Sequence, residues 1–181
     1  MKYKQLVIAI LAIATGLLIF IASLVTTSQK GELHADKVSI KRFYIGEKVL
    51  PDHVLYPVLM LIDRGLLSLS GGEARVFLRI RLAQDRMISA QKLLEKQAEP
   101  LALSTLTKSQ KYVILAAQEF IDSQDYSDEV GIAVYTALQE NTLNLAKIQR
   151  SFKTIPTDPI GGLIFESEAL LTAVGNKLIA K

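Results

Sequence analysis

The feature that most constrains the fold of this chain is an uninterrupted apolar run from Leu6 to Val25. These 20 residues carry no charge, and only Thr15, Gly16 and Ser23 fall outside the clearly apolar set. As a helix rising about 1.5 Å per residue, the run spans roughly 30 Å, the thickness of the hydrocarbon core of a bilayer. A helix satisfies its own backbone hydrogen bonds, so it can lie in lipid without a partner. The run therefore predicts a transmembrane helix, with the lipid bilayer as the partner of Leu6 to Val25.

A cleaved signal peptide is the competing interpretation of this run. Lys2 and Lys4 would form its basic region, and residues 26–28 would supply small side chains for cleavage. The apolar stretch of a signal peptide is usually about 7–15 residues long, however, which favours a retained anchor.

Flanking charges orient such an anchor, because basic residues favour the cytoplasmic side. Lys2, Lys4 and the amino terminus lie beside the run, whereas the other side begins with Lys30 next to Glu32. A wider window, which includes the basic residues of 37–42, argues for the reverse orientation. We expect a single-pass protein of the cell membrane with a cytoplasmic N-terminus and an extracytoplasmic domain.

Composition excludes several classes of chemistry. Because the chain has no cysteine, it has no lipoprotein acylation site, no disulfide and no thiolate metal site. Two of the 21 Lys and Arg precede the apolar run, and all 18 Asp and Glu follow it, so the part after the run has 19 basic residues and a net charge of +1. A nearly neutral domain lacks the basic surface that binds nucleic acid. His34 and His53, the only histidines, show no metal-binding spacing. We expect no catalytic residues, no cofactor and no metal, and therefore no enzyme.

Hydrophobic periodicity and helix-terminating residues predict an all-α fold, with the N-terminal transmembrane helix followed by a bundle of four to five helices. The expected organisation is a signal-anchor segment over 1–28, a linker or extended arm over 29–49, a core helical domain over 50–153, and a loop with a C-terminal helix packed on the core over 154–181. The expected helices cover 57–69, 72–97, 101–123, 128–152 and 158–180.

Local patterns give these helices their expected surroundings. The helix over 57–69 is apolar on all sides and is therefore predicted to be buried; Asp63 and Arg64 at its centre argue against a helix on a membrane surface. Ser70 and Glu73 match a capping box that would open the next helix. The segment Gln84-Asp85-Arg86 is interpreted as solvated helix surface.

The helix over 128–152 has the clearest pattern. Apolar residues recur at heptad spacing with one polar member, Asn141. A buried Asn at such a position can fix the register of a bundle. The sequence alone leaves this open, and favours Asn141 at the edge of the seam, facing water.

The segment from Leu50 to Arg64 resembles an uncharacterised bacterial family of domains of unknown function. Its members share a Leu-Pro-Asp-x-x-Leu-Tyr-Pro motif followed by a helix that ends in an acidic-Arg pair. The matching residues are Leu50, Pro51, Asp52, Leu55, Tyr56, Pro57, Asp63 and Arg64, and similarity continues to Tyr112. The resemblance implies an anchored or secreted protein with a helical extracytoplasmic region, and implies no activity. In physical terms the prolines rigidify a turn, and Leu55 and Tyr56 are expected to dock on the bundle.

These features predict a membrane-anchored extracytoplasmic helical domain that acts as a non-enzymatic structural or protein-interaction module of the cell envelope. A partner protein in the envelope is expected, and nothing in the sequence identifies it. The alternative is an envelope sensor or a helical bundle that binds a small ligand, which would need a cavity lined by convergent polar groups.

Overall fold

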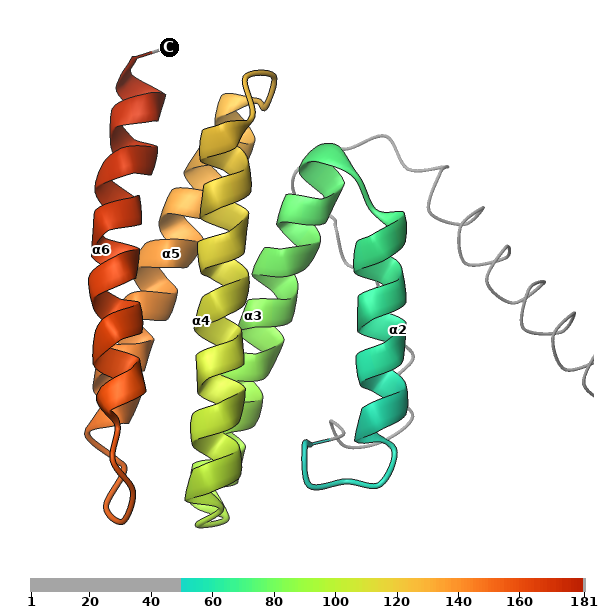
Figure 1. The fold of residues 1–181 in the computed structure, drawn as a ribbon, viewed down its shortest axis with the longest axis vertical. Coiled ribbons are helices and arrows are strands. Elements are labelled where there is room, and N and C mark those ends of the chain that lie inside the picture. Colours follow the sequence, from blue (N-terminus) through green and yellow to red (C-terminus); the bar gives the residue numbers. More distant parts are fainter. Residues whose placement is uncertain (1–49, 181) are drawn as a thin grey trace, which may run out of the picture. The chain divides into compact units, whose positions relative to one another are not determined.

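The computed structural model describes residues 50–180, and every regular element in this range is a helix. The five helices are α2 (Tyr56–Leu69), α3 (Gly72–Glu95), α4 (Glu99–Asp122), α5 (Asp128–Gln149) and α6 (Asp158–Ile179) (Figure 1). They belong to one compact unit. The prediction of an all-α bundle is confirmed for these residues.

Two of the expected segments, the apolar run Leu6–Val25 and the arm over 29–49, lie outside the described residues. Among residues 50–180, no helix combines the length and the apolar character that crossing a bilayer requires.

Helices α3 to α6 form a four-helix bundle joined by short connections, as up-and-down bundles are. Helix α4 lies against the other three, and α5 lies against α3, α4 and α6. The interior holds two apolar clusters, one around Phe120, Val130 and Leu138 and the other around Leu106, Leu145 and Ile160. Because these side chains are almost wholly removed from water, their burial is the main stabilising contribution to the bundle.

The helix ends differ in part from the predicted ones. Helix α4 begins at Glu99, because Pro100 fits the first turn, where its missing N–H is not needed, and so does not break the helix. The capping box at Ser70 is wrong: Gly71 is the N-cap of α3 without a side-chain cap, and the Ser70 hydroxyl donates to the Leu66 carbonyl at 2.7 Å.

A buried polar layer crosses the middle of the bundle. The Gln110 side-chain amide donates to Ser167 Oγ at 2.6 Å and to Thr142 Oγ1 at 3.1 Å, and it accepts from Asn141 Nδ2 at 2.8 Å. The Ser109 hydroxyl donates to the Ala83 carbonyl at 2.6 Å, so all four helices contribute. The prediction that Asn141 faces water is therefore wrong, because Asn141 is 5% exposed and is hydrogen-bonded within the layer. A satisfied network of this kind fixes the register of the helices.

Close packing at one end of the bundle holds α6 in place. A Cβ added at Gly131 would lie 2.5 Å from both Leu178 and Phe120, so any larger residue would require these packed side chains to move. The Lys177 ammonium donates to the carbonyl oxygens of Phe120 and Ile121, at 2.8 and 2.7 Å, and to that of Ser123. These carbonyls end α4, where a cation is favoured.

Candidate docking surface on helix α2

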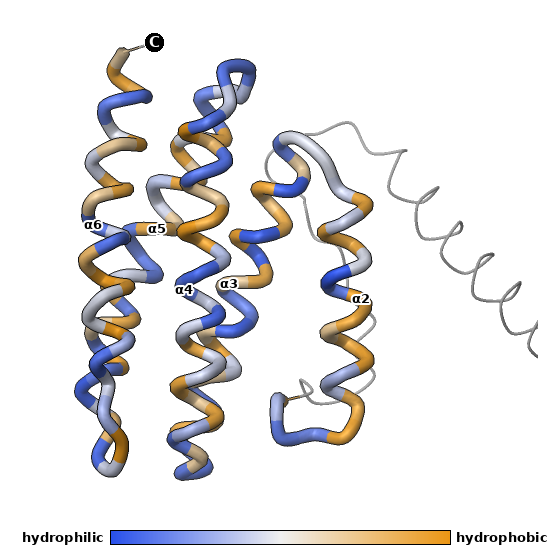
Figure 2. Tube along the Cα trace, in the orientation of Figure 1, coloured by the Kyte–Doolittle hydropathy of each residue, from blue (hydrophilic) through white to orange (hydrophobic). Residues whose placement is uncertain are grey.

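Helix α2 differs from the other four because none of its residues is buried. Its backbone lies near that of α3 and of no other described helix. Figure 2 shows that α2 is nonetheless hydrophobic along most of its length. The prediction that this helix is buried is wrong. A helix that is apolar on all sides requires apolar surroundings, but these need not be the core of its own domain.

Large aliphatic side chains cover the side of α2 that faces away from α3, and continue into the turn before it. We define this α2 outer face by its exposed members, Val54, Leu55, Val58, Leu61, Ile62, Leu66 and Leu69. Leu61 is 66% exposed and Leu69 is 69% exposed. Monomeric soluble domains rarely expose a contiguous apolar patch of more than a few hundred Å², and larger ones mark contacts with proteins or membranes. The α2 outer face is therefore the candidate functional site.

The only acidic side chain of α2, that of Asp63, lies on the opposite side of the helix and faces the bundle. Asp63 Oδ2 lies 3.5 Å from Arg86 Nη2 of α3, and both side chains are largely buried. The acidic-Arg pair of the motif therefore does not meet within α2: Asp63 pairs across to Arg86, and Arg64 is exposed. The interpretation of Arg86 as solvated surface is wrong, since the residue is 5% exposed.

Arg86 connects three helices. Its guanidinium lies 4.3 Å from the centre of the Tyr112 ring of α4, a cation–π geometry, and its Nη2 lies 3.2 Å from Met60 Sδ of α2. Tyr56 lies beside the same guanidinium, and burial raises the pKa of its hydroxyl above the ordinary value. Arg86 Nε has no hydrogen-bond partner among the described residues. One incompletely satisfied arginine thus fastens α2 to the bundle.

The turn before α2 holds the first half of the motif. Leu50 is buried, and its carbonyl accepts from the His53 backbone N–H at 2.9 Å, which closes the turn next to Pro51. Asp52 pairs with Lys96 Nζ at 3.0 Å, and this hydrogen bond is the main reason that the pKa of Asp52 is lowered. The expected docking of Leu55 is wrong, because this side chain is 55% exposed on the α2 outer face.

Pro57 and Tyr56 behave as their residue types predict. Pro57 lies in the first turn of α2, where a proline needs no N–H partner. Tyr56 is partly buried against Arg86, which meets the expectation that it would dock on the bundle.

A second cluster of charges joins α3 to α4 and the loop after it. Glu119 accepts from Arg75 Nε at 2.7 Å, from Arg79 and from the Tyr126 hydroxyl at 3.1 Å. Burial first, and the Glu119 carboxylate second, raise the pKa of Tyr126. Every member serves a helix contact, so this cluster is structural.

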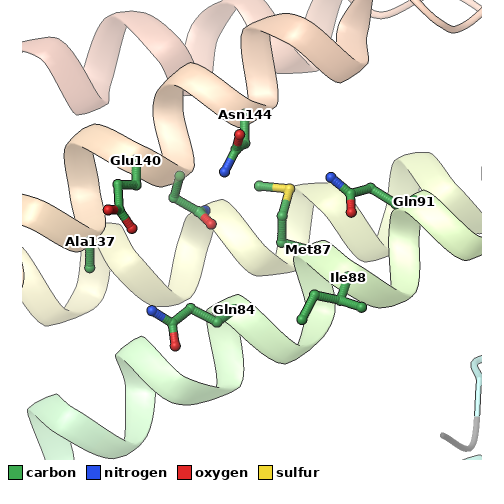
Figure 3. A pocket seen from close by; sticks show the side chains of 8 residues that line it. Gln84, Met87, Ile88, Gln91, Ala137, Glu140 and Asn144 are labelled. Atoms are coloured by element: carbon green, nitrogen blue, oxygen red, sulfur yellow. The ribbon is translucent and has the colours of Figure 1, made fainter.

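An open groove of about 290 Å³ lies between α3 and α5 (Figure 3). Its lining is rich in amides and comprises Gln84, Met87, Ile88, Gln91, Ala137, Glu140, Asn141 and Asn144. The amide of Asn141 is already engaged, since Nδ2 donates to Gln110 Oε1 and Ser109 Oγ. Ligand sites usually measure about 300–1,000 Å³ and bury most of the ligand, so this groove is at the small end and is open.

No group of three or more acidic or histidine side chains within residues 50–180 could hold a metal ion. The described part of the chain is a packed four-helix bundle, with the apolar helix α2 attached along one edge. Residues 48–154, more than half of the chain, match the family described as Domain of unknown function (DUF5667), and the chain belongs to this family. Comparison with curated proteins and with solved structures gives no match. The expectation of an uncharacterised domain family is confirmed.

Proposed function

We propose that the chain is a membrane-anchored helical domain displayed outside the cytoplasm, and that it is a non-enzymatic structural or protein-interaction module of a bacterial cell envelope. The apolar run Leu6–Val25 supports the anchor, and the charges of Lys2 and Lys4 support the orientation. The Leu-Pro-Asp-x-x-Leu-Tyr-Pro motif supports membership of an anchored or secreted group.

The observation that carries the proposal is the α2 outer face. The bundle α3–α6 buries its own apolar side chains, and α2 presents its own to the surroundings. Such a surface makes contacts and performs no reaction, since its side chains carry no titratable or nucleophilic group. The α2 outer face is therefore the docking surface of the module.

Cysteine labelling of the full-length chain tests this function, because the natural sequence contains no cysteine. Leu61→Cys reports on the α2 outer face, and Phe165→Cys on α6 is its matched control, with natural side chains 66% and 76% exposed. We expect a membrane-impermeant maleimide added to intact spheroplasts to label Phe165→Cys, and to label Leu61→Cys severalfold less. Both should react fully after denaturation.

Each failure of this experiment contradicts a separate part of the proposal. If neither cysteine reacts before lysis, the domain is not extracytoplasmic. If both react equally, nothing docks on the α2 outer face. Alkaline extraction of the same membranes tests the anchor separately. If the extraction releases the chain, the chain is not an integral membrane protein.

A small-ligand-binding bundle is the second candidate, and the groove between α3 and α5 is the observation in its favour. The candidate is weaker because the groove is open and its buried amide, Asn141, already has partners in the bundle. Glu140 and the free amides of Gln84, Gln91 and Asn144 could bind a small polar ligand only at an open surface. A ligand that raised the melting temperature of the parent chain but not of a Gln91→Leu variant would support this second function.

A further inference from the structure

We propose that the phospholipid bilayer itself covers the α2 outer face, so that α2 lies in the interface between membrane and water as a second membrane contact of the chain. This inference rests on the proposed anchoring by Leu6–Val25. It identifies the occupant of the docking surface, and it makes α2 a device that holds the bundle in one orientation on the membrane.

The placement of Asp63 removes the main objection to such a helix. A charged pair at the centre of α2 would oppose burial in a membrane if both charges faced outward. Asp63 points inward to Arg86, 3.5 Å away, and is only 13% exposed. No acidic side chain belongs to the α2 outer face, so no carboxylate has to leave water when this face meets lipid.

Arg64 lies where an interfacial helix accepts a cation. It is exposed, and it follows Leu61 by three residues, which places it at the flank of the α2 outer face. A long basic side chain in this position can direct its aliphatic part along the apolar surface and its guanidinium to lipid phosphates. The arrangement of an aliphatic face with a basic flank is typical of helices that lie in a membrane surface.

The chemistry of the face fits lipid better than protein. Its seven side chains are all Val, Leu or Ile, without a hydrogen-bonding group and without an aromatic ring. Contacts that dominate protein interfaces are enriched in Trp, Tyr and Arg, whereas Leu and Val are under-represented among them. A bilayer needs only apolar area, and its affinity grows with that area.

The chain between the apolar run and the described domain ends directly at α2. Residues 26–49 number 24, so at full extension they reach at most roughly 80 Å. Leu50 then begins the turn before α2, which makes α2 the described helix nearest in sequence to the proposed anchor. Because the anchor keeps the bilayer within this reach, the docking of α2 is effectively intramolecular and needs only a modest affinity.

Tryptophan fluorescence tests the proposal, since the natural chain contains no tryptophan. Full-length Leu61→Trp and its control Phe165→Trp are reconstituted into vesicles of phosphatidylcholine and phosphatidylglycerol, with or without lipids brominated near the top of the acyl chain. We expect the emission of Leu61→Trp to be blue-shifted and quenched at least twofold by the brominated lipids. Phe165→Trp should emit as in water and be quenched little.

An Ile62→Asp substitution added to Leu61→Trp provides a second variant. It places a carboxylate on the outer face without touching α3, so the helical circular dichroism should be retained while the quenching is lost. Unchanged quenching in this double variant would overturn the proposal, because the introduced tryptophan by itself, and not the α2 outer face, would then drive the contact with lipid.

The remaining outcomes separate this inference from the proposed function. Leu61→Trp that is blue-shifted but not quenched is covered by protein, which in these vesicles is this chain itself: the bilayer is then excluded as the occupant, and the docking function stands. If that blue shift disappears when the chain is diluted in lipid, the occupant is a second copy of the chain, which also overturns the proposal. If Leu61→Trp emits as in water, the bilayer does not cover the face and this proposal fails, whereas the docking function is decided by the cysteine labelling on spheroplasts, where the partner proteins are present.

Discussion

Helix α2 and the bundle α3–α6 are both rich in apolar residues, yet they arrange them in opposite ways. In the bundle, Phe120 and Leu138 are wholly buried and the charges lie outside or at helix contacts. In α2, Leu61 and Leu69 face outward, and the one carboxylate, Asp63, faces inward. The comparison teaches that apolar content alone does not place a helix in a core. The side of α2 that meets the domain is the side that carries its one carboxylate, Asp63, which pairs with Arg86.

The two regions are also held by different forces. The bundle is stabilised by two apolar clusters and by a polar layer to which all four helices contribute. Helix α2 is attached through Arg86 and a few half-buried side chains, among them Met60. Local opening free energies follow the number of buried contacts, so α2 should open well before the bundle unfolds.

The largest expected difference between the regions is the cost of truncating an apolar side chain. Phe120→Ala, in the bundle, should destabilise the full-length chain in detergent micelles by about 3–5 kcal/mol, because it leaves a cavity in a packed interior. Leu61→Ala should change the stability by less than about 0.5 kcal/mol, because it removes an exposed side chain. Chemical unfolding followed by circular dichroism measures both. Equal costs would show that α2 is part of the cooperative core.

The second prediction concerns the attachment of α2. Asp63→Ala leaves the Arg86 guanidinium largely buried without its carboxylate, which should cost about 1–3 kcal/mol. Because α2 lies against α3 alone, the cost should appear as local opening of α2, with the bundle still folded. Hydrogen exchange should therefore accelerate at the amides of α2 and remain unchanged in α4 and α5.

The exposed Arg64→Ala is the control for this prediction and should leave exchange unchanged in both regions. Faster exchange throughout the bundle in Asp63→Ala would mean that the ion pair supports the whole domain.

The same comparison shows how far sequence reasoning can go. Periodicity and helix-ending residues predict the five helices of the described part, since both are local properties. The partner of Asp63 is Arg86, 23 positions away on another helix, and no local pattern reveals it. The one available signal is energetic: a carboxylate inside an apolar helix requires a cation, and Arg86 stands next to the buried positions of α3.

The error at Asn141 has the same origin. Its partners, Ser109 and Gln110, lie on α4, 32 and 31 positions away. A polar residue within an apolar seam is compatible with water or with a buried network, and only the facing helices decide between them. The docking surface is not predictable for a related reason. The sequence of α2 does not show that this helix lies against α3 alone, with no backbone contact to α4, α5 or α6.

The third prediction applies one substitution to both regions with opposite expected signs. Gly131→Ala should destabilise the bundle by about 1–3 kcal/mol, since its Cβ would overlap Phe120 and Leu178. Gly65→Ala in α2 meets nothing within 4 Å and should stabilise that helix by about 0.5–1 kcal/mol, because alanine is the better helix former. Thermal unfolding measures the first change and hydrogen exchange in α2 the second. A destabilising Gly65→Ala would show that another chain packs closely against that position.

The smallest expected effect uses acid to compare one exposed carboxylate in each region. Lys96 lowers the pKa of Asp52 at the start of α2, and hydrogen bonds from Thr154 lower the pKa of Glu99 at the base of the bundle. A carboxyl group whose pKa is lower in the folded state than in the unfolded state stabilises the folded state. This stabilisation is fully present at a pH above the unfolded-state pKa, and it is lost as the pH falls through the folded-state pKa. Asp52→Asn and Glu99→Gln should therefore each melt slightly below the parent at neutral pH, and the difference should shrink to nothing in strong acid. In Asp52→Asn, hydrogen exchange should accelerate only near α2. In Glu99→Gln, it should accelerate only near residues 153–154, whose backbone N–H groups donate hydrogen bonds to the Glu99 carboxylate. A difference that persists in strong acid would show that the substitution acts through something other than charge.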